Sequence, residues 1–141
     1  MNANNILLIS ALILFCSCDW GRTPSKNRFQ TAADIIIPTD IQIIQDEYQD
    51  MWQDYAIIYK IGLTPASTTQ LIKSIHKSKY YDPVKAKSSI LKAGSESYNG
   101  VSGEWLDSED GYLFQGKEGR TFFSIELDTV NREAIFKELA D

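Results

Sequence analysis

The sequence predicts an α+β fold in which an antiparallel sheet of about five strands packs against one helix, in the order β-β-α-β-β-β. Two observations predict it: several runs alternate apolar and polar residues with the period of a strand, and one stretch has the apolar period of a helix. The chain has 141 residues, of which 43% are hydrophobic and 23% are charged. This length and composition are typical of one ordinary globular domain.

The first two strands are expected on either side of a short turn. Residues 40–48 are rich in isoleucine, which favours a strand. Residues 54–63 alternate, with tyrosines and isoleucines at the odd positions 55–61 facing one side and Ala56, Ile58 and Lys60 facing the other. Residues 49–53 would then form the turn of a hairpin.

The helix is expected to begin directly after the second strand. Thr64 supplies a hydroxyl suited to an N-cap, and Pro65 suits the first helical position because its missing N–H has no partner there. Leu71, Ile72 and Ile75 then form an apolar stripe with helical spacing. We therefore predict a helix from residue 65 to about residue 79.

The second half of the chain is expected to be mostly strands. Residues 84–99 favour a long loop with a short helical turn at 85–93, because glycine, serine and asparagine follow. Residues 104–106, 111–115 and 120–128 have strand patterns and are separated by polar turns at 107–110 and 116–119. We interpret residues 132–139 as a final strand, although their composition also favours a short helix.

The N-terminus carries an export pattern. Ten residues, 6–15, form an apolar run that contains only one hydroxyl, and the sequence becomes polar within two residues after Cys18. A membrane-spanning helix needs about 20 apolar residues, whereas the core of a signal peptide needs about 7–15. The length of the run therefore favours export over membrane spanning.

Phe15, Cys16, Ser17 and Cys18 follow one another at the end of this run. They resemble the lipobox of bacterial lipoprotein signal peptides, in which a small residue precedes the cysteine that is lipidated. The resemblance covers residues 1–18 and implies a mature chain anchored through acylated Cys18 in the cell envelope, facing the periplasm or the cell surface. A cytosolic protein with a buried N-terminal helix, or an uncleaved anchor, are the alternatives.

The resulting domain organisation has three parts. Residues 1–18 are expected to be the signal peptide, residues 19–34 a flexible tether, and residues 35–141 a single α+β domain. The proposed tether contains glycine, proline, serine and mixed charge without any period. Both cysteines lie within residues 1–18, so the domain is expected to fold without a disulfide bond.

Charge is segregated along the chain. The net charge is -5, which argues against a nucleic-acid-binding domain. Residues 60–92 nevertheless carry seven lysines and only one acidic residue, Asp82. Such a basic strip would suit an envelope protein partner or an anionic surface, while the plainer interpretation is a solvated helix face.

Five residues are candidates for partner binding. Lys77 and Lys79 belong to the basic strip, and Tyr80 and Tyr81 follow at the expected end of the helix. Trp52 lies in the expected hairpin turn, where burial is difficult, and exposed tryptophan and tyrosine are enriched at binding hot spots.

No catalytic constellation is apparent in the sequence. His76 is the sole histidine, and the carboxylates Asp46, Glu47, Asp50 and Asp54 cluster around the first hairpin. A calcium loop beginning at Asp107 fails because its glycine falls at the fifth position instead of the sixth. We therefore expect a non-catalytic binding domain without metal or cofactor; the alternative is an envelope hydrolase that uses these carboxylates or His76.

Overall fold

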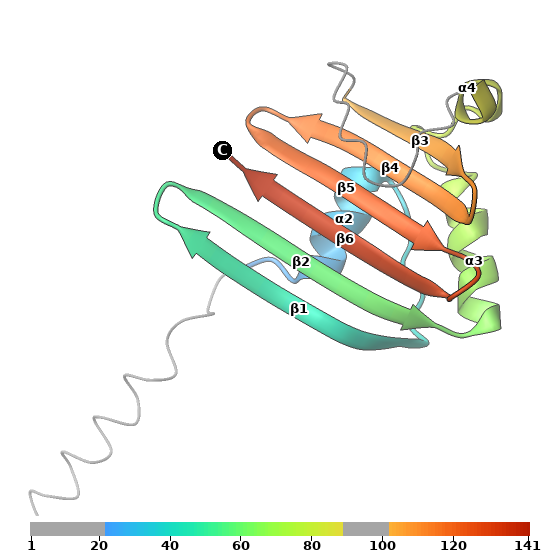
Figure 1. Ribbon diagram of the computed structural model, residues 1–141, viewed down its shortest axis with the longest axis horizontal. Coiled ribbons are helices and arrows are strands. Elements are labelled where there is room, and N and C mark those ends of the chain that lie inside the picture. The colour runs from blue at the N-terminus through green and yellow to red at the C-terminus, as the bar shows by residue number, and fades with distance from the viewer. Residues whose placement is uncertain (1–21, 89–101) are drawn as a thin grey trace, which may run out of the picture.

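A computed structural model describes residues 22–88 and 102–141 of the chain (Figure 1). Within these ranges the fold is α+β, with one six-stranded antiparallel sheet in the order β1-β2-β6-β5-β4-β3. The strands are β1 Ile41–Met51, β2 Asp54–Leu63, β3 Gly103–Ser108, β4 Gly111–Glu118, β5 Thr121–Asp128 and β6 Glu133–Ala140. The helices are α2 Ser25–Ala33, α3 Pro65–Ile75 and α4 Pro83–Ser88.

The sheet joins both ends of the described chain. β1 and β2 form a hairpin, β3 to β6 follow one another as neighbours, and β6 then pairs with β2. The part of the chain that the structure describes thus has six strands instead of about five. Residues 132–139 were open to a helical interpretation, but Glu133–Ala140 is a central strand whose pairing on both sides explains its extended conformation.

Two predicted elements are confirmed with their physical reasons. β2 has the predicted bounds, and Ile57, Tyr59 and Ile61 on its predicted inner face are buried. Thr64 caps α3, because its hydroxyl accepts a hydrogen bond from the backbone N–H of Ser67 while the Ser67 hydroxyl accepts one from the N–H of Thr64. This reciprocal pair satisfies two of the helix's unpaired donors.

α3 ends at Ile75 and is shorter than predicted. The next turns are tighter, since the N–H of Lys77 donates to Ser74 and the N–H of Ser78 donates to Ile75. The Ser78 hydroxyl then donates to the carbonyl of Ala33 at 2.8 Å. This contact ties the end of α3 to the end of α2.

The expectation of a flexible tether over residues 19–34 does not hold for Ser25–Ala33, which form α2. Phe29 is fully buried, and its ring lies 5.3 Å from that of Phe136 and 6.4 Å from that of Tyr59. The residue pattern did not indicate this helix, because one aromatic residue among polar neighbours supplies most of the side-chain surface that the helix buries. The folded unit therefore begins before residue 35.

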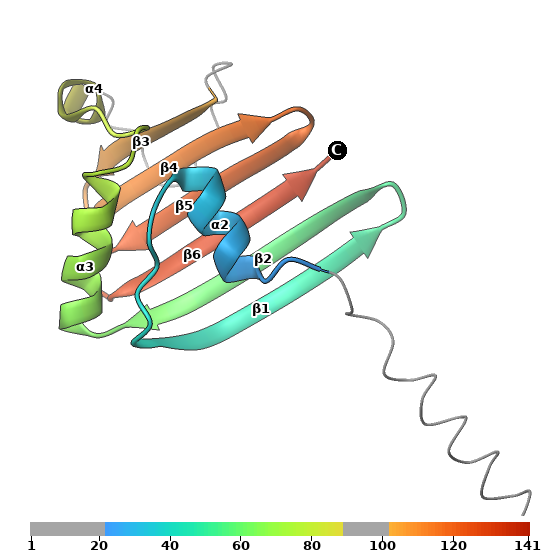
Figure 2. The same cartoon turned by 180° about the vertical axis from the view of Figure 1, so that it is seen from behind.

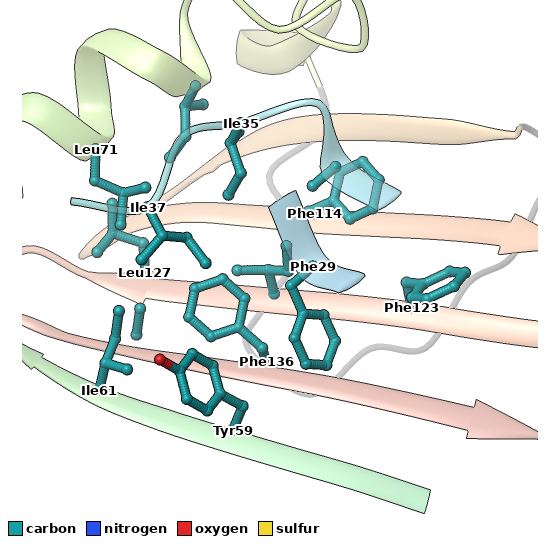
Figure 3. Close-up of a cluster of buried hydrophobic side chains, with 14 of the residues drawn as sticks. Phe29, Ile35, Ile37, Tyr59, Ile61, Leu71, Phe114, Phe123, Leu127 and Phe136 are labelled. Atoms are coloured by element: carbon teal, nitrogen blue, oxygen red, sulfur yellow. The ribbon is translucent and has the colours of Figure 1, made fainter. Parts of the chain in front are cut away.

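The hydrophobic core lies on one face of the sheet, beneath α2 (Figures 2 and 3). Side chains from five strands meet there with Phe29 from α2 and Leu71 from α3. Ile37, in the segment that leads from α2 to β1, closes the space between the two helices. The core thus fixes the positions of both helices against the sheet.

The predicted turns in the second half are shorter than expected. β3 continues to Ser108 and β4 begins at Gly111, so the turn between them is Glu109-Asp110. A Cβ atom at Gly111 would lie 1.9 Å from the carbonyl oxygen of Leu127, which explains the glycine. The short helical turn expected at residues 85–93 corresponds in part to α4, which begins at Pro83, and the remainder of the expected loop lies outside the described residues.

Candidate functional site

The five residues predicted to bind a partner do not form one surface. Trp52 is fully exposed at the tip of the β1–β2 hairpin, with a positive φ of 74°. Tyr80 and Tyr81 lie beside β3, at the opposite edge of the sheet. Five strand spacings of about 4.8 Å put roughly 24 Å between these two edges, so one small contact cannot include both.

Lys79 and Tyr80 are positioned by the end of α2. Asp34 ends this helix in the left-handed conformation, and its carboxylate accepts a hydrogen bond from the backbone N–H of Lys79 at 2.7 Å. The Ser78 hydroxyl accepts a hydrogen bond from the N–H of Tyr80 at 3.2 Å. The segment after α3 is therefore held against α2 by two polar contacts, that of Lys79 with Asp34 and that of Ser78 with Ala33.

Lys79 and Tyr80 line a cavity with a volume of about 560 Å³. We call it the cationic groove. It lies between α2 and the β4–β5 hairpin, and three of the four charged residues that line it are basic. These four are Arg28, Lys79, Lys117 and Glu118.

The lysines of the cationic groove rest on aromatic rings. Lys79 Nζ lies 4.9 Å from the centroid of the Tyr80 ring, and Lys117 Nζ lies 4.7 Å from that of Phe122. Both lysines are exposed, but only Lys79 faces the groove, because Lys117 pairs with Phe122 and lies on the face of the sheet opposite α2. A ring beneath an ammonium group holds it in place without neutralising its charge.

A buried carboxylate lies beside the groove. The side chain of Glu138 has no exposed surface, and Arg28 Nε donates to its Oε2 at 2.9 Å. The Tyr55 hydroxyl also donates to Glu138 and accepts a hydrogen bond from Arg28 Nη2 at 3.0 Å. Burial raises the pKa of Tyr55, and its hydrogen bond to Glu138 raises it further. Glu138 compensates Arg28, and the ammonium group of Lys117 lies over Phe122, its partner in β5, on the face of the sheet opposite α2. The outward positive charge of the groove therefore comes mainly from Lys79.

Tyr81 belongs to a separate aromatic cluster with His76. The His76 and Tyr81 rings stack at 4.7 Å, and His76 Nε2 lies 2.9 Å from the Tyr112 hydroxyl. The Tyr81 hydroxyl donates to Asp107 at 3.4 Å, and burial followed by the charge of Asp107 raises the pKa of Tyr81 and Tyr112. The cluster contacts α3, β3 and β4, and its members do not line the cationic groove.

Lys77 lines a second cavity, of about 420 Å³, together with Lys73 and the exposed Ile36. The third cavity, of about 460 Å³, lies on the face of the sheet opposite α2 and is bordered mainly by apolar side chains such as Ile58, Phe122 and Leu139. The two predicted lysines, Lys77 and Lys79, thus border different cavities.

The carboxylates of the first hairpin take part in separate hydrogen bonds. Asp46 accepts one from the Ser25 hydroxyl at 2.6 Å, while Glu47 accepts from Gln45 and Gln49, each at 2.7 Å. Asp50 accepts a hydrogen bond from the backbone N–H of Trp52 at 3.2 Å. Neither these residues nor Asp54 line any of the three cavities, and no shared site joins them to His76.

Over residues 22–88 and 102–141, no three His, Cys, Asp or Glu side chains gather in a way that could hold a metal ion. No helix in the same ranges is long and apolar enough to cross a membrane. Cys18, the residue that the lipobox resemblance implies to be acylated, lies outside them.

Sequence reasoning missed Arg28 and Lys117 as groove residues. Arg28 stood in the segment interpreted as a tether, and Lys117 stood in a predicted turn. Neither position carries a local signal, because the groove forms only when α2 packs beside the β4–β5 hairpin.

Comparisons of the chain with protein-family models, with curated proteins and with solved structures found no match.

Proposed function

We propose that the protein is a cell-envelope lipoprotein, anchored through acylated Cys18, whose small domain binds an acidic segment of an envelope protein without catalysing a reaction. The proposed location in the cell envelope is supported by the apolar run of residues 6–15 and by the lipobox-like residues that end at Cys18. The bound segment is expected to occupy the cationic groove.

α2 shortens the expected distance between the domain and the membrane. It begins at Ser25, seven residues after Cys18. Seven residues span at most about 25 Å, whereas a tether of sixteen residues would allow about 55 Å. The domain is thus proposed to work close to the membrane surface, on partners that reach it there.

One observation carries the binding part of the proposal: Arg28 and Lys79, from distant parts of the chain, border one hollow of about 560 Å³. A concave site suits a protruding acidic segment better than it suits a flat lipid surface, which a lysine would approach from a convex face. Tyr80 adds an aromatic wall of the kind enriched at binding hot spots.

The alternative of an envelope hydrolase gains no support from this geometry. His76 contacts Tyr81 and Tyr112, while Asp46, Glu47 and Asp50 are held by their own hydrogen bonds along β1. A hydrolase would be expected to bring two such groups to a common cavity.

The first experiment tests the anchor. Intact-mass analysis of the membrane fraction should show a mature chain that begins at Cys18 and carries acyl groups, and the Cys18→Ala variant should lose this species. A soluble wild-type product without added lipid would overturn the proposed address.

The second experiment tests the groove with a hexaglutamate peptide, measured by fluorescence anisotropy at low salt. The variant Lys79→Glu should bind it at least ~3-fold more weakly, because reversing one exposed charge changes binding by about 0.7 kcal/mol or more. The control Lys87→Glu changes one exposed lysine outside the groove and should bind as the wild type does. Equal losses in both variants would indicate nonspecific attraction, and binding of phosphatidylglycerol vesicles but not of the peptide would replace the protein partner with a lipid surface.

A further inference from the structure

The outer edge of β1 is unpaired within the described chain. β1 is the first strand in the sheet order, and its only partner there is β2 (Figure 1). An antiparallel edge strand turns every second residue's N–H and C=O away from the sheet. These groups form a template on which another extended segment can add as a further strand.

β1 is long and accessible for an edge strand. It has eleven residues, nearly all of them exposed, including four apolar or aromatic side chains. These are Ile43 at 58%, Ile44 at 48%, Tyr48 at 45% and Met51 at 43% exposure. Edge strands are usually short or covered, so this combination marks a surface suited to pairing.

The two halves of β1 are not equally suited. The register with β2 shifts between Ile43 and Gln45, which marks a β-bulge in the first half. A bulge bends the strand and interrupts the row of outward groups. From Asp46 to Met51 the register is continuous over six residues, a length of about 20 Å.

This regular half carries charge of one sign. It contains Asp46, Glu47 and Asp50 and has no lysine or arginine. Asp46 faces the core side, where Ser25 and Arg22 contact it. Lys60, which is paired with Gln45 on the neighbouring strand, makes an ion pair with Glu133 at 2.8 Å. The negative charge of Glu47 and Asp50 thus stands at the edge with no basic residue on β1 itself.

The charge decides which strand can pair there. Like charges directly opposite one another destabilise a strand pair, whereas opposite charges stabilise it. If two copies of the regular half paired with each other, carboxylates would face carboxylates. A strand that alternates lysine or arginine with apolar residues carries its cations on one face, so it would set them beside Glu47 in one register and beside Asp50 in the register shifted by one residue.

We propose that the β1 edge, over Asp46–Met51, binds a basic extended segment of a partner protein by strand addition. This surface is separate from the cationic groove and has the opposite charge. Its failure would leave the proposed function intact, because the groove is tested with an acidic peptide and a different pair of variants.

The test uses the mature full-length chain and a synthetic peptide of alternating lysine and valine, with alternating glutamate and valine as the matched control peptide. Amide hydrogen exchange should show new protection over residues 46–51 with the lysine peptide and none with the glutamate peptide. Binding of the lysine peptide without this protection would overturn the proposal.

Charge reversal provides the decisive variant. Glu47→Lys/Asp50→Lys should lose at least ~10-fold in affinity for the lysine peptide and gain binding of the glutamate peptide. The control Glu109→Lys/Glu126→Lys reverses two exposed acidic residues away from β1 and should retain the wild-type preference. A reversed variant that still prefers the lysine peptide would overturn the proposal, as would wild-type dimerisation in sedimentation experiments with β1 protected in the absence of peptide.

Discussion

β3 and β1 are the two edge strands of one sheet, and they differ in how their outer edges are covered. The backbone N–H of Trp105 in β3 donates to the carbonyl of Tyr80 at 3.1 Å, Tyr81 forms a parallel bridge with the same residue, and α4 lies alongside (Figures 1 and 2). β1 has no such cover within the described chain and instead carries a bulge and three acidic residues. One edge is thus closed by the chain itself, while the other is protected only against partners of the same charge.

The difference follows from what each edge can bury. The residues that cover β3 are anchored to α2, since Ser78 and Trp105 Nε1 both donate to the carbonyl of Ala33. α2 crosses the middle of the sheet and reaches β1 through Ser25, whose hydroxyl donates to Asp46. A single short helix therefore completes one edge and leaves the outer side of the other open.

The largest expected effect comes from replacing tryptophan with alanine, first at the β3 edge and then at the β1–β2 hairpin. Trp105 is 1% exposed and packs against Phe114 at 5.1 Å, so Trp105→Ala should lower the free energy of unfolding by about 3–5 kcal/mol. Trp52 is fully exposed, and Trp52→Ala should change it by less than about 0.5 kcal/mol. Urea unfolding followed by far-UV circular dichroism measures both, and similar losses would contradict the assignment of Trp52 to an exposed hairpin tip.

The next prediction concerns the contact by which α2 holds the half of the sheet near β1. Arg28→Met removes the cation that faces the buried carboxylate of Glu138 and should cost about 3 kcal/mol, the lower end of the range because Arg28 is 27% exposed. Adding Glu138→Gln should restore part of the loss, because an amide needs no counter-charge. A double variant no more stable than Arg28→Met would show that packing, and not the unpaired charge, sets the cost.

The sequence predicted β2 and the start of α3 better than α2, and the reason is physical. The bounds of β2, and the threonine cap of α3, depend on neighbouring residues, and both were predicted correctly. α2 could not be predicted in the same way, because the burial of Phe29 depends on strands that follow much later in the chain. The pairing of Arg28 with Glu138 crosses 110 positions and leaves no local pattern.

The candidate site shows the same limit. Lys79 and Tyr80 were predicted from a local excess of lysine and from tyrosines at a helix end, and both line the cationic groove. Arg28 from α2 and Glu118 from the β4–β5 hairpin complete that groove, and the edge of β1 is recognised only once the sheet order is known. Residue types suggest binding chemistry, whereas strand order decides which of them meet.

The smallest expected effect comes from a pair of glycines, one in the edge strand β3 and one in β2, beside the other edge strand. A Cβ atom at Gly103 in β3 would lie 2.9 Å from Tyr80 Cδ1 and 3.1 Å from Phe114 Cζ, so Gly103→Ala should cost about 1–2 kcal/mol. At Gly62, beside β1, the nearest atom is Ile44 Cδ1 at 3.5 Å, which is ordinary contact. Gly62→Ala should therefore change the free energy of unfolding by less than about 0.5 kcal/mol, or raise it slightly.

This pair also separates stability from binding. Gly103→Ala must displace Tyr80 or Phe114, and because Tyr80 lines the cationic groove, hexaglutamate binding should weaken under conditions where the variant is still fully folded. Gly62→Ala should leave that binding unchanged. If both variants bind the peptide equally well, Tyr80 is a cover for the edge of β3 and contributes nothing to the groove, and the two roles assigned to the segment after α3 reduce to one.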